Sequence, residues 1–193
     1  MKPRLLLLEN SVGVLTSSAK LALLRSSYQH PSRIASIMVQ TKCGFNDVPG
    51  GVPGSELLVS LGPTLTIDIG FDPTFDPAQL ATGKLPAPGI KGLHGLVDTG
   101  ATESCIDNLL AAQLNLPIVD RRMIAGIAGP HQANVYLAQV HVPFLTYTIW
   151  GAFAGVDLKA GGMVHSALIG RTFLRAFTMV YEGRTGTVTI SND

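Results

Sequence analysis

Short apolar stretches, each interrupted by polar residues, glycine or proline, dominate the chain from residue 57 onward. In the clearest of them, apolar residues alternate with polar ones at Leu65, Ile67 and Ile69. This alternation has the period of a half-buried strand, and the apolar run 57–61 before it is also strand-like. Proline and glycine crowd residues 71–92 and predict a long surface loop. An apolar strand then leads into a polar turn that begins at Asp98.

Helical spacing follows this turn. Four apolar residues recur as they do on one face of a helix: Ile106, Leu109, Leu110 and Leu114. Asp107 is a suitable N-cap and Pro117 cannot continue a helix, so the sequence predicts a short helix between them. A second short helix near the C-terminus carries three apolar residues that we expect in the core: Phe173, Leu174 and Phe177.

Two hairpins complete the pattern. In the first, strand-like segments at 121–124 and 135–142 flank a glycine-containing tip at 125–129. The apolar positions of its return strand change phase near Leu137, which predicts a β-bulge there. The second hairpin turns at 183–186. Short strands, together with 21 glycines and 12 prolines, indicate an all-β fold.

The chain of 193 residues, 46% of them apolar, suits one domain with an extension. Residues 41–56 are so rich in glycine and proline that we expect neither a helix nor a strand ladder to continue through them. We therefore predict an N-terminal extension at 1–40, a linker at 41–56 and a domain at 57–193.

Several roles remain open for the extension. Its apolar run 5–8 is shorter than the roughly 7 to 15 residues of a signal-peptide core, and the chain offers no run of about 18 apolar residues for a membrane span. Its serines and scarce acids are also typical of an organelle transit segment. The apolar runs 5–8 and 21–24 would suit an amphipathic membrane-surface anchor. Because Cys43 and Cys105 form no C-x-x-C pattern, we expect reduced cysteines and a cytoplasmic protein.

Charge and histidine spacing argue against several function classes. The net charge is only +1 and the basic residues are scattered, so we expect no nucleic-acid partner. None of the five histidines is spaced as in H-E-x-x-H, so we expect no metal and no cofactor.

Asp98, Thr99 and Gly100 form the motif with the clearest chemical use. The predicted strand would hold the Asp98 carboxylate at the end of a rigid element. Thr99 can lock the turn through its hydroxyl, and Gly100 lets another backbone approach closely. By itself, this tripeptide is equally typical of an ordinary turn that begins with aspartate.

Three segments in order give the motif a context: L-V-D-T-G-A at 96–101, M-I-A-G-I-A-G at 123–129 and A-L-I-G-R-T-F-L at 167–174. They resemble the catalytic turn, the flap tip and the supporting strand and helix of retropepsins, the aspartic proteases of retroviruses, and of their bacterial single-domain relatives. The resemblance implies a retropepsin-like closed β-barrel, the single-lobe acid protease fold, with one or two short helices.

The resemblance also implies roles for individual residues. The catalytic residues would be Asp98, Thr99 and Gly100. The substrate would contact Ala101, Thr102, Ala125, Gly126 and Ile127. The site would be supported by Leu168, Ile169, Gly170 and Arg171. Viral enzymes commonly have an acid where this chain has Thr102, so we expect the next residue, Glu103, to pair with Arg171.

The implied activity is hydrolysis of peptide or protein substrates by two carboxylates, one ionised and one protonated. The chain has only one D-T-G, and Asp68-Ile69-Gly70 lacks the hydroxyl. A homodimer is therefore required, with Asp98 of both copies on the two-fold axis and Thr99 bonding across the interface. The alternative is a catalytically silent dimer of the same fold that binds a peptide or a protein partner.

Overall fold

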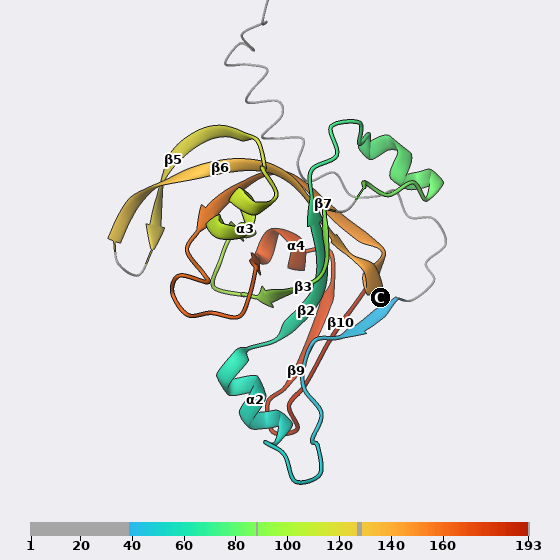
Figure 1. Ribbon diagram of the computed structural model, residues 1–193. Coiled ribbons are helices and arrows are strands. Elements are labelled where there is room, and N and C mark those ends of the chain that lie inside the picture. Colours follow the sequence, from blue (N-terminus) through green and yellow to red (C-terminus); the bar gives the residue numbers. More distant parts are fainter. Residues whose placement is uncertain (1–38, 88, 127–128, 193) are drawn as a thin grey trace, which may run out of the picture.

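The computed structural model describes residues 39–87, 89–126 and 129–192, and these residues form an all-β protein with short helices (Figure 1). The first strands are β1 (Gln40–Lys42), β2 (Thr64–Gly70), β3 (Ile90–Val97), β4 (Cys105–Asp107) and β5 (Ile118–Gly126). The later strands are β6 (Gly129–Val142), β7 (Tyr147–Val156), β8 (Ala167–Ile169), β9 (Thr178–Glu182) and β10 (Thr187–Ser191). The helices are α2 (Gly54–Leu61), α3 (Asn108–Gln113) and α4 (Arg171–Leu174), with 3-10 turns η1 (Pro77–Thr82) and η2 (Pro143–Leu145). The predicted all-β class is confirmed.

The larger sheet has the strand order β2-β3-β8-β4-β7-β6-β5, and β2 also pairs with β6. Among the described strands, the pairings therefore run in a cycle from β2 through β3, β8, β4, β7 and β6 back to β2. Within it, β3–β8 and β4–β7 are parallel and the other pairs are antiparallel. Because β3 and β8 are parallel and Val97 lies opposite Ile169, both strands end at the same edge.

One core lies between the strands of this sheet. The alternating apolar residues of β2 are almost fully buried, as their period predicted: Leu65, Ile67 and Ile69. Ile106, Val140 and Ile169 join them from β4, β6 and β8. Burying each such side chain stabilises the fold by roughly 1.5–3 kcal/mol relative to leaving it exposed.

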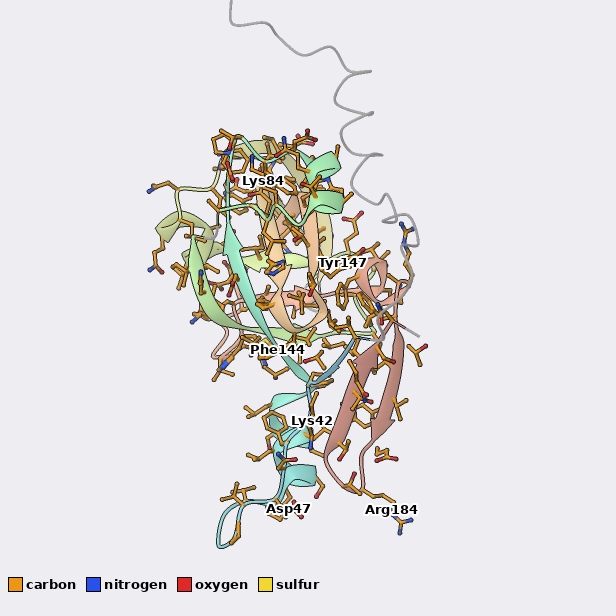
Figure 2. All side chains as sticks on the ribbon, turned by 90° about the vertical axis from the view of Figure 1, so that its right-hand side faces the viewer. Lys42, Asp47, Lys84, Phe144, Tyr147 and Arg184 are labelled. Carbon is orange, nitrogen blue, oxygen red and sulfur yellow. The ribbon has the colours of Figure 1, made fainter. Side chains whose placement is uncertain are left out.

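A smaller sheet has the order β1-β10-β9, so a strand near the start of the described chain pairs with one near its end. The β9–β10 hairpin is where the sequence predicted it. Arg184, at the tip of this hairpin, and Asp47, close to α2, lie at the opposite end of the molecule from Lys84 (Figure 2).

Residues 57–61 lie in helix α2, so the prediction of a strand there is wrong. Pro53 directly precedes the helix with φ −56°, which suits a first helical turn, and Gly62 ends the helix with φ 70°. Leu58 is buried whereas Val59 is 84% exposed. The helix thus buries only one side, which the short and mostly apolar run 57–61 does not reveal.

The bounds of the linker predicted at 41–56 are also wrong at both ends. Strand β1 reaches Lys42, which pairs with Thr189 of β10, and helix α2 begins at Gly54. A Cβ on Gly54 would lie 2.5 Å from the backbone oxygen of Phe45, so this glycine marks a close approach of two chain segments.

The short helix after Asp107 is confirmed as α3. The Asp107 carboxylate Oδ1 accepts hydrogen bonds from the backbone N–H groups of Leu109 and Leu110, at 3.1 Å each. Oδ2 of the same group accepts from Lys159 N at 2.9 Å. The cap therefore holds both the helix and the chain that follows β7.

The strands of the first predicted hairpin are β5 and β6, but the bulge lies elsewhere. Tyr136 pairs with Ile118 and Val135 pairs with Asp120, so the extra residue is Val119 of β5. The phase change in the sequence of β6 therefore does not mark an extra residue of β6 itself. The surface loop predicted at 71–92 contains η1 and the first residues of β3.

The proposed extension lies outside the described residues, apart from its last two positions. Within the part of the chain that the structure describes, no helix combines the length and the apolar character needed to cross a membrane.

Candidate active site

The Asp98 carboxylate stands directly after β3, where β3 and β8 end side by side. The Asp98 N–H donates to Ile169 O at 3.0 Å, which extends the β3–β8 pairing by one residue. Its Oδ1 accepts from Gly100 N at 2.8 Å, closing a tight turn. A Cβ on Gly100 would lie 3.0 Å from this oxygen, so glycine suits the turn. Oδ2 of the half-buried Asp98 accepts no hydrogen bond from the described residues and is free to act on a ligand.

Arg171 holds the turn from behind. One guanidinium nitrogen, Nη1, donates to Thr99 O at 2.8 Å and to Gly100 O at 3.0 Å. The other, Nη2, donates to Thr102 Oγ1 at 2.8 Å. This planar fork spans acceptors in fixed positions that the compact ammonium of a lysine would match less well.

The expected pair between Glu103 and Arg171 is therefore wrong. Glu103 Oε2 instead lies 2.6 Å from Nη2 of Arg122, on β5. The Arg171 guanidinium is turned toward the backbone of the turn, where two carbonyls and the Thr102 hydroxyl accept from Nη1 and Nη2. Glu103 is left to join the turn to the β5–β6 hairpin.

The segment from β8 into α4 packs closely against the turn. Arg171 N donates to Ala101 O at 3.0 Å, and Thr172 N donates to Thr102 O at 3.0 Å. A Cβ on Gly170 would lie 2.6 Å from Glu103 O, so only glycine permits this approach. Ile169 is buried, and Leu168 pairs with Leu96 of β3. The structure thus brings the four expected support residues against the Asp98 turn.

The expected substrate-contacting residues fall into two groups. Ala101 and Thr102 belong to the Asp98 turn. Ala125 and Gly126 belong to β5, opposite Pro130 and Gly129 of β6, at the far end of the hairpin. Ile127 lies outside the described residues. The hydroxyl of the exposed Thr99 forms no hydrogen bond with another described residue, so the expectation that it locks its own turn fails; Thr99 contributes its backbone oxygen.

Three further residues shape the site, and sequence reasoning missed them. Ser104 is buried and its Oγ accepts from Gly170 N at 3.1 Å. Burial raises the pKa of the Cys105 thiol to about 11; the positive charge of Arg122 opposes this shift, while Glu103 and Asp98 add to it. A raised pKa favours the protonated thiol, which is a weak nucleophile and a weak metal ligand. The sequence marks Arg122 only as a charged residue in a strand of the predicted hairpin, which does not reveal its contact with Glu103.

The described residues provide one carboxylate at this turn with an open oxygen. The neighbouring acid, Glu103, is committed to Arg122. In the described ranges, no group of three histidine, cysteine or acidic side chains is placed to hold a metal ion. Asp98 alone can accept or donate one proton, whereas hydrolysis by carboxylates requires a second acid beside it.

No family model and no curated protein matches the sequence. Among solved structures, the chain is similar to EIAV protease complexed with the inhibitor HBY-793, with 17% identity over 58% of this chain and 85% of that chain, at a TM-score of 0.38. It is also similar to a retropepsin-like aspartic protease from Rickettsia conorii, with 9% identity over 83% of this chain and 97% of that chain, at a TM-score of 0.44.

Proposed function

We propose that this protein is an aspartic endopeptidase in which a homodimer pairs two Asp98 carboxylates. The observation that carries the proposal is the turn after β3. One Asp98 oxygen is fixed by Gly100 N and the other is open, while Arg171 and the β8–α4 segment hold the backbone rigid. Such preorganisation suits a catalytic group and is more than an ordinary turn requires.

The chemistry calls for a second carboxylate within a few ångströms. The ionised group takes a proton from water while the protonated group polarises the scissile carbonyl. Each chain supplies one open carboxylate, so a two-fold axis beside Asp98 brings in the other. The exposed hydroxyl of Thr99 is available to the partner copy. Because one carboxylate acts in its ionised form and the other in its protonated form, we expect cleavage to have a bell-shaped pH profile.

An extended peptide is the substrate that suits the β5–β6 hairpin. Strand β5 ends the order of the larger sheet, so its outer edge has no neighbour among the described strands. A peptide can pair with such an edge as an added strand. Glu103 and Arg122 join the middle of β5 to the Asp98 turn. Ala101, Thr102, Ala125, Gly126 and Ile127 are the proposed contacts to the substrate, with the hairpin as a flap.

The test is cleavage of a peptide library at acidic and neutral pH by the wild type and by Asp98→Asn. Asparagine keeps the oxygen that accepts from Gly100 N but cannot ionise. Asp76→Asn is the matched control, because Asp76 caps η1 in the loop before β3 and asparagine is an equally good cap.

We expect the wild type and Asp76→Asn to cleave alike and Asp98→Asn to be inactive. Equal cleavage by all three proteins would refute the role of Asp98. Peptide binding by a folded wild type that cleaves nothing at any pH would favour the silent binding module instead.

A further inference from the structure

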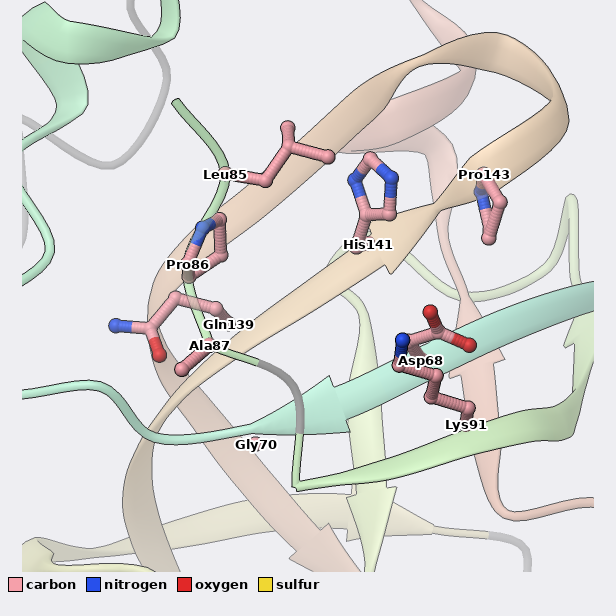
Figure 3. A pocket seen from close by; sticks show the side chains of 9 residues that line it. All are labelled: Asp68, Gly70, Leu85, Pro86, Ala87, Lys91, Gln139, His141 and Pro143. Carbon is pink, nitrogen blue, oxygen red and sulfur yellow. The ribbon is translucent and has the colours of Figure 1, made fainter. Parts of the chain in front are cut away.

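A cavity of about 180 Å³ lies on the outer side of β2 and β6, beneath the chain that leads into β3 (Figure 3). Asp68 of β2 and His141 of β6 are cross-strand partners on its wall, and Lys91 of β3 stands beside them. Leu85 and Pro86 line its other side. One carboxylate, one ammonium and one imidazole, from three different strands, therefore face one small space.

A strand irregularity brings Lys91 to this cavity. Ile67 pairs with Leu93 and Ile69 pairs with Ile90, so β3 has an additional residue at this point. Gly92, with φ 68°, forms part of the irregularity, and its N–H donates to Asp68 Oδ1 at 2.9 Å. Such bulges redirect side chains, and here the consequence is that Lys91 lines the same cavity as Asp68.

The two charged groups remain open. Asp68 Oδ1 accepts from Gly92 N, but Oδ2 accepts from no described residue. Neither Asp68 nor Lys91 forms an ion pair with a described residue, although both line the cavity. The ring of His141 is held by Thr148, whose Oγ1 lies 2.9 Å from Nδ1. Burial lowers the pKa of His141, against a smaller opposing effect of Asp68, so the imidazole is neutral at pH 7 and the lining carries no net charge.

The side of the cavity formed by residues 85–87 is held in place by Asp72. Its Oδ2 accepts from Ala87 N at 3.1 Å, while Oδ1 accepts from Thr74 N and Thr74 Oγ1. The Gln139 amide binds the Asp72 backbone on both sides, accepting from its N–H at 2.7 Å and donating to its oxygen at 3.3 Å. These bonds tie the loop to β6, so the cavity exists before any ligand arrives.

We infer that this cavity binds a free α-amino acid with a small apolar side chain. The ammonium group of the ligand would lie at the Asp68 carboxylate and its carboxylate group at the Lys91 ammonium. Its side chain would contact Leu85, Pro86 and Pro143. A space of about 180 Å³ is below the range of roughly 300–1,000 Å³ of drug-sized ligands, so the ligand is small. The Asp68 carboxylate and the Lys91 ammonium have no ion-pair partner among the described residues, and their charges cancel. A ligand that carries both a positive and a negative charge is therefore favoured over a simple anion or cation.

This site is separate from the Asp98 turn. Lys91 lies near the start of β3 and Asp98 directly follows its end, seven residues apart, which corresponds to at most about 23 Å of extended strand. The inference therefore does not rest on the proposed proteolysis, and loss of one activity leaves the other measurable.

The first test is isothermal titration calorimetry of the full chain with L-valine and with two analogues that each lack one charged group. The analogue 3-methylbutanoate lacks the ammonium, and 2-methylpropylamine lacks the carboxylate. We expect L-valine to bind with a Kd on the order of 1 mM. Each analogue should bind at least about tenfold more weakly, because one charge-assisted contact is lost. Absence of L-valine binding at about 20 mM, or equal binding of either analogue, would overturn the inference.

The second test assigns the charges with Asp68→Asn and Lys91→Gln. Asparagine keeps the acceptor for Gly92 N, and Lys91 is exposed, so both variants should retain the native circular dichroism spectrum. Each should weaken L-valine binding about tenfold or more, while the control Asp76→Asn should not. If both variants fold and bind L-valine like the wild type, the cavity is not the binding site. If either variant fails to fold, the analogue series on the wild type still decides.

Discussion

Replacing Arg171 tests how the turn after β3 is held. Its guanidinium donates to Thr99 O at 2.8 Å, to Gly100 O at 3.0 Å and to Thr102 Oγ1 at 2.8 Å. A hydrogen bond that involves a charged group contributes roughly 1.5–3 kcal/mol. These three residues are exposed, however, so water solvates their oxygens once the arginine is gone. We therefore expect Arg171→Met to lower the free energy of unfolding by only about 1–2 kcal/mol in total.

Arg171→Lys separates charge from geometry. A lysine ammonium is a point charge that cannot engage three acceptors in the fork arrangement, so we expect about half of the loss seen for Arg171→Met. The assay is urea unfolding at pH 7, with Arg184→Met as the control. Arg184 lies at the tip of the β9–β10 hairpin (Figure 2), and replacing it should change stability by less than about 0.5 kcal/mol. Equal effects of Arg171→Met and Arg184→Met on stability would refute the claim that Arg171 holds the turn after β3.

Four further predictions concern groups within the fold. Asp107→Ala should lower the free energy of unfolding by about 2–4 kcal/mol, because three backbone N–H groups lose their acceptor; a loss below about 1 kcal/mol in urea would show that the cap is dispensable. Gly170→Ala should cost about 1–3 kcal/mol, because its Cβ would lie 2.6 Å from Glu103 O, and an unchanged unfolding midpoint would contradict this packing. Burial lowers the pKa of His165 below its ordinary value of 6.5. The unfolded chain therefore binds the proton first, and stability falls as the pH drops below about 6.5. His165→Gln should remove that part of the dependence, and parallel stability curves for both proteins would exclude His165 as its source. Burial also raises the pKa of Cys105 to about 11, so its thiol should react with a disulfide reagent at pH 8 more slowly in the native protein than in denaturant; equal rates would contradict the raised pKa.

The sequence predicted those parts of the fold that depend on residues close together along the chain. The alternation at Leu65, Ile67 and Ile69 depends on the period of a strand, and Asp107 caps α3 because its short side chain reaches the first N–H groups of the helix. The strand before Asp98 also follows from its short apolar segment. These features require no knowledge of distant parts of the chain, whereas the supporting role of Gly170 was implied only by the family resemblance.

What sequence reasoning missed depends on distant partners. The choice of Glu103 between Arg171 and Arg122 is made by the position of β5, which spacing along the chain does not give. Residues 57–61 lie in a helix that begins at Gly54, where the chain packs against the Phe45 backbone, whereas their composition also suits a strand. The bulge was assigned to β6 because its sequence changes phase, although the extra residue, Val119, belongs to the strand opposite.

The central claim is that one active site is built from two copies of Asp98. Mixing the wild type with Asp98→Asn under conditions that exchange subunits tests it most directly, because a hybrid dimer has only one ionisable aspartate. If the dyad is shared, peptide cleavage falls as the square of the wild-type fraction, to about one quarter in an equal mixture at constant total protein. Cleavage that falls only to about one half would show that each chain acts alone and would contradict the account.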